Sequence, residues 1–331
     1  MSESEVTLEK DGKKLAFDKL ILASGGTPKR LPVPGSELAN IFTLRDLNDT
    51  QGIDKAIGSG EEGKKKDLVI VGSSFIGMEA AVAASKRANV HVVGMESVPF
   101  ERILGSEIGK GIQKFHEKQG TRFYLNASLK EFKGDNSGVQ QVILGDGTTI
   151  KADAVILGVG VKPATEYWSH SGYALAKDGS IETDEYMRVR AIPKGNVYAI
   201  GDIATFAAPH GKTRVEHWNV ASNHARAVAS TIATGTATKY DKMAVFWSAQ
   251  GSQLRYVGTD EASQWQDVFV TGTPDELKFI AYYSKAADIV AVASMQNDPV
   301  VAHCSELLKL GKMPSLDAIK GGANPLDTPL K

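Results

Sequence analysis

One short segment constrains this chain more than any other: DLVIVGSSFIGMEAA at residues 67–81, an apolar run that ends in a glycine-rich turn. The dinucleotide fingerprint G-x-G-x-x-G places such a turn between a strand and a helix. Its first glycine makes the turn, its second lets the backbone approach a pyrophosphate, and its third lets the helix pack on the strand. Gly72 and Gly77 stand at the first and third positions, and Ser74 stands at the second.

A serine in the middle of the fingerprint narrows the approach to a phosphate without closing it. Ser74 is small, and its hydroxyl can donate to a phosphate oxygen. The helix that follows supplies free N–H groups and the positive end of its dipole. The segment therefore predicts a dinucleotide-binding turn. An ordinary tight turn between strand and helix is the alternative that this motif leaves open by itself.

The nucleotide ribose is expected to meet an acidic residue about 20 residues after the turn, near the end of the next strand. Glu96 follows the strand-like segment VHVV at residues 90–93. Its carboxylate would bind ribose hydroxyls and repel a 2′-phosphate, and no arginine stands in its place, so the sequence favours NADH over NADPH. Glu79 lies two residues after the last glycine, where a solvated helix face is the favoured interpretation of its position alone.

Strands and helices alternate around this turn. The apolar pattern predicts strands at residues 68–71, 90–93, 122–125 and 152–161, with helices at 75–87 and 105–120. Ser106 is the expected N-cap of the second helix, and Gly120 the residue just past its end. Two further turns, at 134–138 and 146–147, join shorter strands. This alternation predicts an α/β fold with a parallel, doubly wound sheet.

The flanking regions have other patterns. Residues 6–23 predict a hairpin followed by a buried strand at 19–23, and the proline-rich segment 27–36 predicts an extended crossing between domains. Residues 181–206 predict strands around a Gly-Asp turn, followed by a helix at 219–235. Short aromatic strands from residue 241 predict an antiparallel sheet with a closing helix at 302–310 and a loose polar tail at 321–331.

Composition excludes several functions. The formal net charge of −1 over 331 residues gives no electrostatic footprint for nucleic acid, and no apolar run approaches the ~20 residues of a membrane span. Cys304 is the one cysteine, so no internal disulfide or dithiol centre can form, and we expect it to be a small buried side chain. The polar N-terminal segment lacks the apolar core of a signal peptide, which makes a cytoplasmic location the expectation.

Six segments, in this order along the chain, resemble the flavoprotein reductases that bind two dinucleotides. They are LILASGGTPKRLPVPG, VIVGSSFIGMEAA, AVILGVGVKP, VYAIGDIA, RVEHWNVASNHARAVA and FWSAQGSQLRYVG. The last resembles the C-terminal domain of the apoptosis-inducing-factor-like branch, which includes ferredoxin, rubredoxin and putidaredoxin reductases.

This resemblance implies a Rossmann-like NAD(P)H domain at 44–166 inserted in a partial FAD domain at 1–43 and 167–240, with an α+β interface domain at 241–331. It also implies an FAD-dependent NAD(P)H oxidoreductase that passes a hydride to flavin and electrons to an acceptor, such as a ferredoxin-like protein or a quinone. A homodimer through the C-terminal sheet is implied in the same way.

Site residues follow from the resemblance position by position. The flavin would be bound by Gly201, Asp202 and Lys162, with Glu216, His217, Trp218 and Trp247 near its ring. The nicotinamide nucleotide would be bound by Gly72, Ser73, Ser74, Phe75, Ile76, Gly77, Glu79, Glu96 and Gly160. No catalytic acid, base or nucleophile is assigned, because the flavin performs the chemistry, and no metal site is expected.

The family's first strand, glycine turn and helix, which hold the FAD pyrophosphate, have no counterpart among these residues. We therefore expect a truncated form that retains flavin poorly and leaves the strand at 19–23 with exposed edges and apolar surface. Two functions stay open: a flavin-dependent oxidoreductase, and a non-catalytic nucleotide-binding or interaction module that has lost FAD.

Overall fold

The glycine turn lies at the centre of a parallel sheet in the computed structural model, which describes residues 4–61, 63–208, 211–258 and 265–331. The strand order is β5-β12-β6-β7-β8, and every neighbouring pair is parallel. The bounds are β5 (Ile41–Phe42), β12 (Ala154–Leu157), β6 (Asp67–Val71), β7 (Asn89–Val93) and β8 (Arg122–Tyr124). The predicted doubly wound α/β unit is confirmed.

Both faces of this sheet are covered, which explains why its central strands are continuous apolar runs. Leu68 and Ile70 of β6 pack in the same core cluster as residues of α2 (Phe75–Ala84) and α4 (Ser106–Lys118). Val69 and Val71 point to the other face, against the three-stranded antiparallel sheet β11-β10-β9. The remaining bounds in this part are β9 (Leu129–Asp135), β10 (Gly138–Leu144), β11 (Thr149–Lys151), α1 (Leu47–Ile57) and α3 (Glu101–Leu104).

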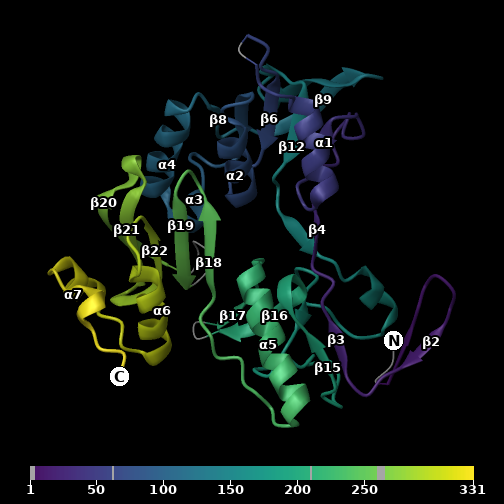
Figure 1. The fold of residues 1–331 in the computed structure, drawn as a ribbon, viewed down its shortest axis with the longest axis vertical. Coiled ribbons are helices and arrows are strands. Elements are labelled where there is room, and N and C mark those ends of the chain that lie inside the picture. Colours follow the sequence, from purple (N-terminus) through teal and green to yellow (C-terminus); the bar gives the residue numbers. More distant parts are fainter. Residues whose placement is uncertain (1–3, 62, 209–210, 259–264) are drawn as a thin grey trace.

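A second part lies at the opposite end of the molecule and is joined to the parallel sheet through β4 (Figure 1). There β4 (Gly26–Pro28) pairs with β13 (Val161–Pro163), so the proline-rich crossing and the return strand run side by side. The other elements of this part are β1 (Glu5–Thr7), β2 (Lys14–Ala16), β3 (Leu20–Leu22), η1 (Glu166–His170), β14 (Ile181–Glu182), β15 (Val197–Ala199), η2 (Gly201–Ile203), β16 (Ala204–Ala208), β17 (Gly211–Thr213) and α5 (Trp218–Thr234).

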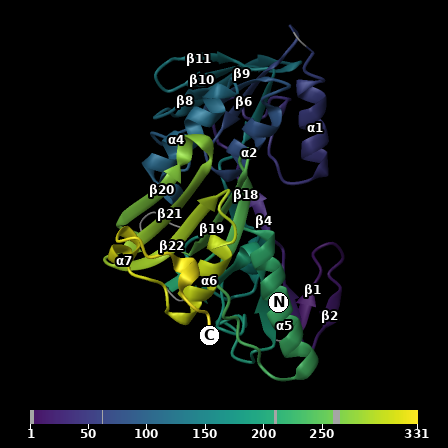
Figure 2. The ribbon, with the colours of Figure 1, turned by 60° about the vertical axis from the view of Figure 1, so that its left-hand side comes forward.

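The third part is the predicted antiparallel sheet, in the order β18-β19-β22-β21-β20. One face of this sheet packs on α6 (Figure 2). The core between them contains Cys304, whose burial raises the pKa of its thiol to about 12. Its elements are β18 (Val245–Ala249), β19 (Gln253–Gly258), β20 (Asp267–Thr273), η4 (Pro274–Glu276), β21 (Lys278–Lys285), β22 (Asp288–Met295), α6 (Val300–Leu310), α7 (Leu316–Lys320) and η5 (Pro325–Asp327).

Four local predictions were wrong. The single strand predicted at 152–161 is divided into β12 and β13, and β13 pairs with β4 in a separate sheet. Ser106 is the first residue of α4 and Gly105, with φ of 81°, is its N-cap, because the short helix α3 already reaches Leu104. The tail is not loose throughout: Pro325 is buried, and the backbone oxygen of Thr328 lies 3.0 Å from His303 Nε2 on α6. These are tertiary contacts that local sequence patterns do not report.

The strand predicted to be buried at 19–23 is the fourth of these corrections. Among the residues that the structure describes, β3 pairs with β15 alone, in parallel, and Ile21 is 43% exposed. The expected apolar exposure at this strand is present, although one parallel partner remains. Within the described residues, no helix is long and apolar enough to cross a membrane.

We predict that one buried histidine makes stability depend on pH. His116 of α4 is buried, and burial lowers its pKa to about 4 from the ordinary 6.5. The unfolded chain therefore binds more protons than the folded chain between pH 4 and 6.5. The stability that His116 contributes as a neutral group is complete above pH 6.5 and is lost as the pH falls toward 4. Urea unfolding of His116→Leu should show a slope of stability against pH that is smaller by up to ~1.4 kcal/mol per pH unit. An unchanged slope would contradict this assignment.

Candidate functional site

The nucleotide turn depends on three glycines that bring β6, β12 and α2 into backbone contact. Gly72 has φ of 113°, and a Cβ there would lie 2.2 Å from the backbone oxygen of Gly158. A Cβ on Gly77 would lie 2.1 Å from the backbone oxygen of Gly72. Gly72 and Gly77, at the first and third positions of the fingerprint, therefore do what it requires. Gly72 bends the chain, and Gly77 lets the helix pack closely.

Ser74, at the middle position, is the N-cap of α2. Its side chain makes no capping hydrogen bond, and the residue is exposed. The first N–H groups of a helix have no partner within the helix. With the exposed hydroxyl of Ser74 beside them, these N–H groups give the turn the donor set that a pyrophosphate needs.

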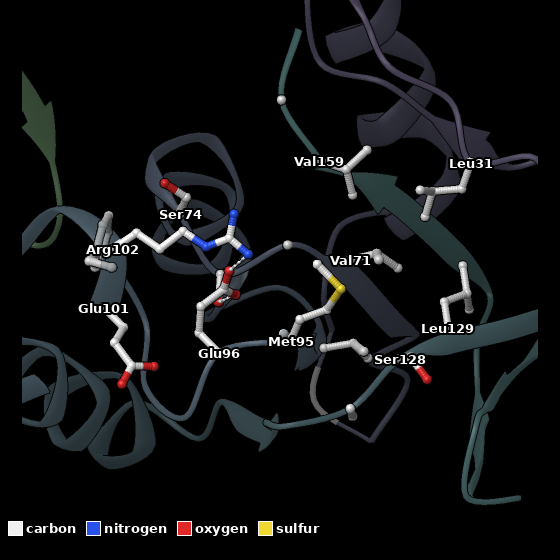
Figure 3. Close-up of a pocket in the computed structure, with 18 of the residues that line it drawn as sticks. Leu31, Val71, Ser74, Met95, Glu96, Glu101, Arg102, Ser128, Leu129 and Val159 are labelled. Carbon is white, nitrogen blue, oxygen red and sulfur yellow. Dashed lines mark hydrogen bonds and ion pairs between the residues drawn. The ribbon is translucent and has the colours of Figure 1, made fainter. Parts of the chain in front are cut away.

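A cavity of about 860 Å³ opens beside this turn. Figure 3 shows an ion pair between Glu96 and Arg102 on one side of it, and the apolar side chains of Leu31, Leu129 and Val159 on the other. Arg102 Nη2 lies 2.8 Å from Glu96 Oε1, and Ser73 Oγ donates to Glu96 Oε2 at 3.4 Å. The predicted ribose-binding acid thus lies at the cavity with its carboxylate held from two directions.

The predicted nucleotide residues divide into two groups. Those that line the cavity are Gly72, Ser73, Ser74, Glu96 and Gly160, whereas Phe75, Ile76, Gly77 and Glu79 do not line it. Phe75 instead packs on the rings of Phe100 and Phe246, with centroids 5.1 and 5.3 Å away.

Glu79 belongs to the contact between α2 and the C-terminal sheet. Its Oε1 accepts from Ser248 Oγ at 2.5 Å and from the Ala249 N–H at 2.9 Å. The solvated helix face favoured for Glu79 from its position alone is therefore wrong.

The Gly-Asp turn forms the second candidate site. Gly201 has φ of 70° and opens the short helix η2 directly after β15. Arg45 Nη2 lies 3.2 Å from Asp202 Oδ2, and Arg214 Nη1 donates to the Asp202 backbone oxygen at 3.1 Å. The carboxylate of Asp202 provides an acceptor at this turn, which fits the hydroxyls of a polyol chain such as the flavin ribityl group.

An aromatic cluster lies at the N-terminus of α5. Trp218 is 62% exposed, and its ring meets that of Trp247 edge-on with centroids 5.0 Å apart. His217 packs against both rings and caps α5 by accepting from the Asn219 N–H at 3.2 Å. Three of the predicted flavin-edge residues are thus in one cluster. The fourth, Glu216, is bound by Arg214 at 2.5 Å.

Lys162 lies on β13, where it forms an ion pair with Glu166 at 2.7 Å. Several site residues were not predicted from the sequence: Arg45, Arg214 and Gly158 at the turns, and Leu31, Val33, Phe100, Arg102 and Leu129 at the cavity. Only Gly158 had a local signal, because it ends a buried apolar strand in the segment LGVG. The others reach the site from elements whose sequences give no indication of it.

The glycine turn and the parallel α/β sheet that carries it define a dinucleotide-binding class of protein. Residues 1–225 match the model of the pyridine nucleotide-disulphide oxidoreductase family, and the chain belongs to that family. Its relatives place it in the apoptosis-inducing-factor-like and ferredoxin reductase branch, which confirms the resemblance seen in the sequence.

Human apoptosis-inducing factor 3 is 33% identical over 308 residues, which cover 92% of this chain and 49% of that protein. Rubredoxin-NAD(+) reductase of Ectopseudomonas oleovorans is 31% identical over 286 residues, 84% of this chain and 70% of that protein. The chain spans about half the length of apoptosis-inducing factor 3.

Two solved structures support the same fold. A ferredoxin reductase from Rhodopseudomonas palustris superposes with a TM-score of 0.83 at 28% identity, over 94% of this chain and 77% of that one. The putidaredoxin reductase–putidaredoxin complex gives 0.86 at 25% identity, over 97% of this chain and 76% of that one. The α/β fold class predicted from the sequence is confirmed.

We predict that Gly72→Ala destabilises the chain much more than Gly179→Ala. Both glycines have positive φ, but only Gly72 has backbone within 4 Å of the added Cβ. The additional cost at Gly72 is that of overpacking, about 1–3 kcal/mol. Urea unfolding of both variants measures the difference, and NADH binding by Gly72→Ala should be weaker as well. Equal stability of the two variants would show that the close contact with Gly158 does not exist.

Proposed function

We propose that this chain carries the nucleotide and flavin sites of a reductase that transfers a hydride from NADH to FAD and passes electrons to an acceptor protein. The observation that carries the proposal is a run of contacts between the two sites. Glu79, two residues after the nucleotide turn, binds Ser248, and the neighbouring Trp247 packs 4.8 Å from His217 at the start of α5.

FAD and the nicotinamide nucleotide supply the redox chemistry when they are bound. The chain's own residues bind and orient them. The free helix N-terminus at Ser74 would hold a pyrophosphate, and Asp202 would accept from hydroxyls of the ribityl chain. His217, Trp218 and Trp247 would cover a flat ring and exclude water from it.

NADH is the favoured nucleotide. The carboxylate of Glu96 can accept from both ribose hydroxyls but repels a 2′-phosphate. The apolar side of the cavity, with Leu31, Leu129 and Val159, offers a surface for a nucleobase. Arg102 is neutralised by Glu96 and so presents little free positive charge to a phosphate.

An acceptor protein is favoured over direct transfer to a small molecule. The rubredoxin and ferredoxin reductases among the relatives are named for protein acceptors. In this chain the exposed ring of Trp218 lies in the aromatic cluster and would form part of a docking surface. Cytoplasmic location and a homodimer through the C-terminal sheet stay predictions from the sequence.

A non-catalytic nucleotide-binding module is the second candidate. The exposure of Ile21 on β3 favours it, because within the described part of the chain the sheet that would support a flavin consists of the pair β15–β3 at this point. The two candidates differ in one property, which is whether the chain takes up FAD that NADH can reduce.

The deciding experiment is an absorbance spectrum of the purified chain with added FAD and then with NADH under anaerobic conditions. With FAD added in excess, to offset the weak retention expected from the sequence, a bound flavin spectrum that bleaches on NADH is the expected result. Asp202→Ala should weaken FAD binding about tenfold or more, the loss of one well-placed charged hydrogen bond. Asp298→Ala is the matched control, because Asp298 also binds an arginine, Arg255, but lies outside the site. This variant should leave the FAD affinity unchanged. A colourless chain that still binds NADH would favour the second candidate.

A further prediction concerns nucleotide choice. Glu96→Gln removes the repulsive charge and frees Arg102, so the ratio of NADPH to NADH affinity should rise about tenfold. Glu101→Gln is the matched control, because Glu101 also lines the cavity but its carboxylate binds Ser97. Titration of each variant with both nucleotides measures the ratio. A rise of the same size in both variants would refute a specific role for Glu96.

A further inference from the structure

We propose that His224 is a positioning residue of the flavin site, which holds the Gly201 N–H and thereby sets the geometry of the Gly201–Asp202 turn. The inference rests on the proposed function and assigns a role to a residue to which the sequence gave none. His224 lies within α5, one turn after the residue that packs on Gly201, namely Ala221.

The contact between them is a hydrogen bond from a backbone amide to an imidazole. The Gly201 N–H donates to His224 Nδ1 at 3.2 Å, and the side chain of His224 is completely buried. Nδ1 can accept only when it carries no proton, so the ring proton is on Nε2. Burial lowers the pKa of His224 to about 4, which keeps the ring neutral, and therefore an acceptor, near neutral pH.

Aromatic packing fixes the plane of this imidazole. The rings of Phe206 and Tyr240 meet it nearly at right angles, with centroids 4.6 and 4.5 Å away. Among the described residues, Nε2 has no hydrogen-bond partner. The bond to Gly201 is thus the polar contact that the structure gives this ring, and a histidine needed only to fill space would not require it.

The turn is held from three directions. His224 accepts from the amide of Gly201, Arg214 donates to the backbone oxygen of Asp202, and Arg45 binds the carboxylate of Asp202. Of the three contacts, only that of His224 is made by a completely buried side chain. Without it the buried Gly201 N–H has no acceptor, and the turn would move to find one. The Asp202 carboxylate, one residue away, would move with it.

Two substitutions separate this role from packing. His224→Leu places an apolar side chain of similar size in the same space and removes the acceptor. His224→Gln supplies an amide oxygen that can accept from the Gly201 N–H. His116→Leu is the matched control, since His116 is equally buried, lies on α4 and has no contact with the turn. If His224→Leu does not fold, His224→Met provides an unbranched replacement with only a weak acceptor.

The experiment uses the full chain and two measurements: FAD affinity by flavin fluorescence, and the exchange rate of the Gly201 amide by ¹H–¹⁵N NMR without cofactor. His224→Leu should weaken FAD binding about tenfold and speed Gly201 exchange by at least as much. His224→Gln should restore both to within about twofold of the wild type. His116→Leu should leave both unchanged.

Equal losses in His224→Leu and His224→Gln would overturn the inference, and so would a Leu variant that behaves as the wild type. An effect of the same size in His116→Leu would also overturn it, because general destabilisation would then explain the result. If the wild-type chain itself takes up no FAD, the proposed function is wrong and the flavin-site role of His224 falls with it. If the wild type does bind FAD, a result that contradicts the predictions for the variants counts against the role of His224 and not against the proposed function.

Discussion

The contact of backbone with backbone at Gly72, Gly77 and Gly158 is the constraint on which the site depends. A single added methyl at Gly72 or Gly77 would meet a carbonyl oxygen at little more than 2 Å. Because β6, β12 and α2 meet there without intervening side chains, the N-terminus of α2 is directed at the cavity. The serine at the middle of the fingerprint is tolerated because it lies on the open side of this contact.

The C-terminal sheet joins the two candidate sites. Glu79 of α2 accepts two hydrogen bonds from the end of β18, and Trp247 of the same strand packs on His217 of the flavin side. A strand that touches both sites thus fixes the position of each relative to the other, which is what transfer between two bound ring systems requires.

Much of the fold was predictable because local patterns are strong here. Continuous apolar runs, glycine turns and aromatic alternation predicted four of the five strands of the parallel sheet, β5 being missed, and the antiparallel C-terminal sheet. The errors occurred where a neighbour far along the chain decides the outcome. Gly105 rather than Ser106 is the N-cap of α4, because α3 precedes it. Ile21 of β3 is exposed at a strand that, among the described residues, pairs with β15 alone.

The sequence by itself determined the nucleotide turn, the acid at Glu96 and the Gly-Asp turn, since each depends on residue type at short spacing. Only the tertiary structure decided what surrounds them. Arg45 meets Asp202 across 157 residues, and His224 meets Gly201 across 23. A long-range contact leaves no periodic signal in a single sequence, because its geometry is set by how the strands and helices pack rather than by the residues on either side.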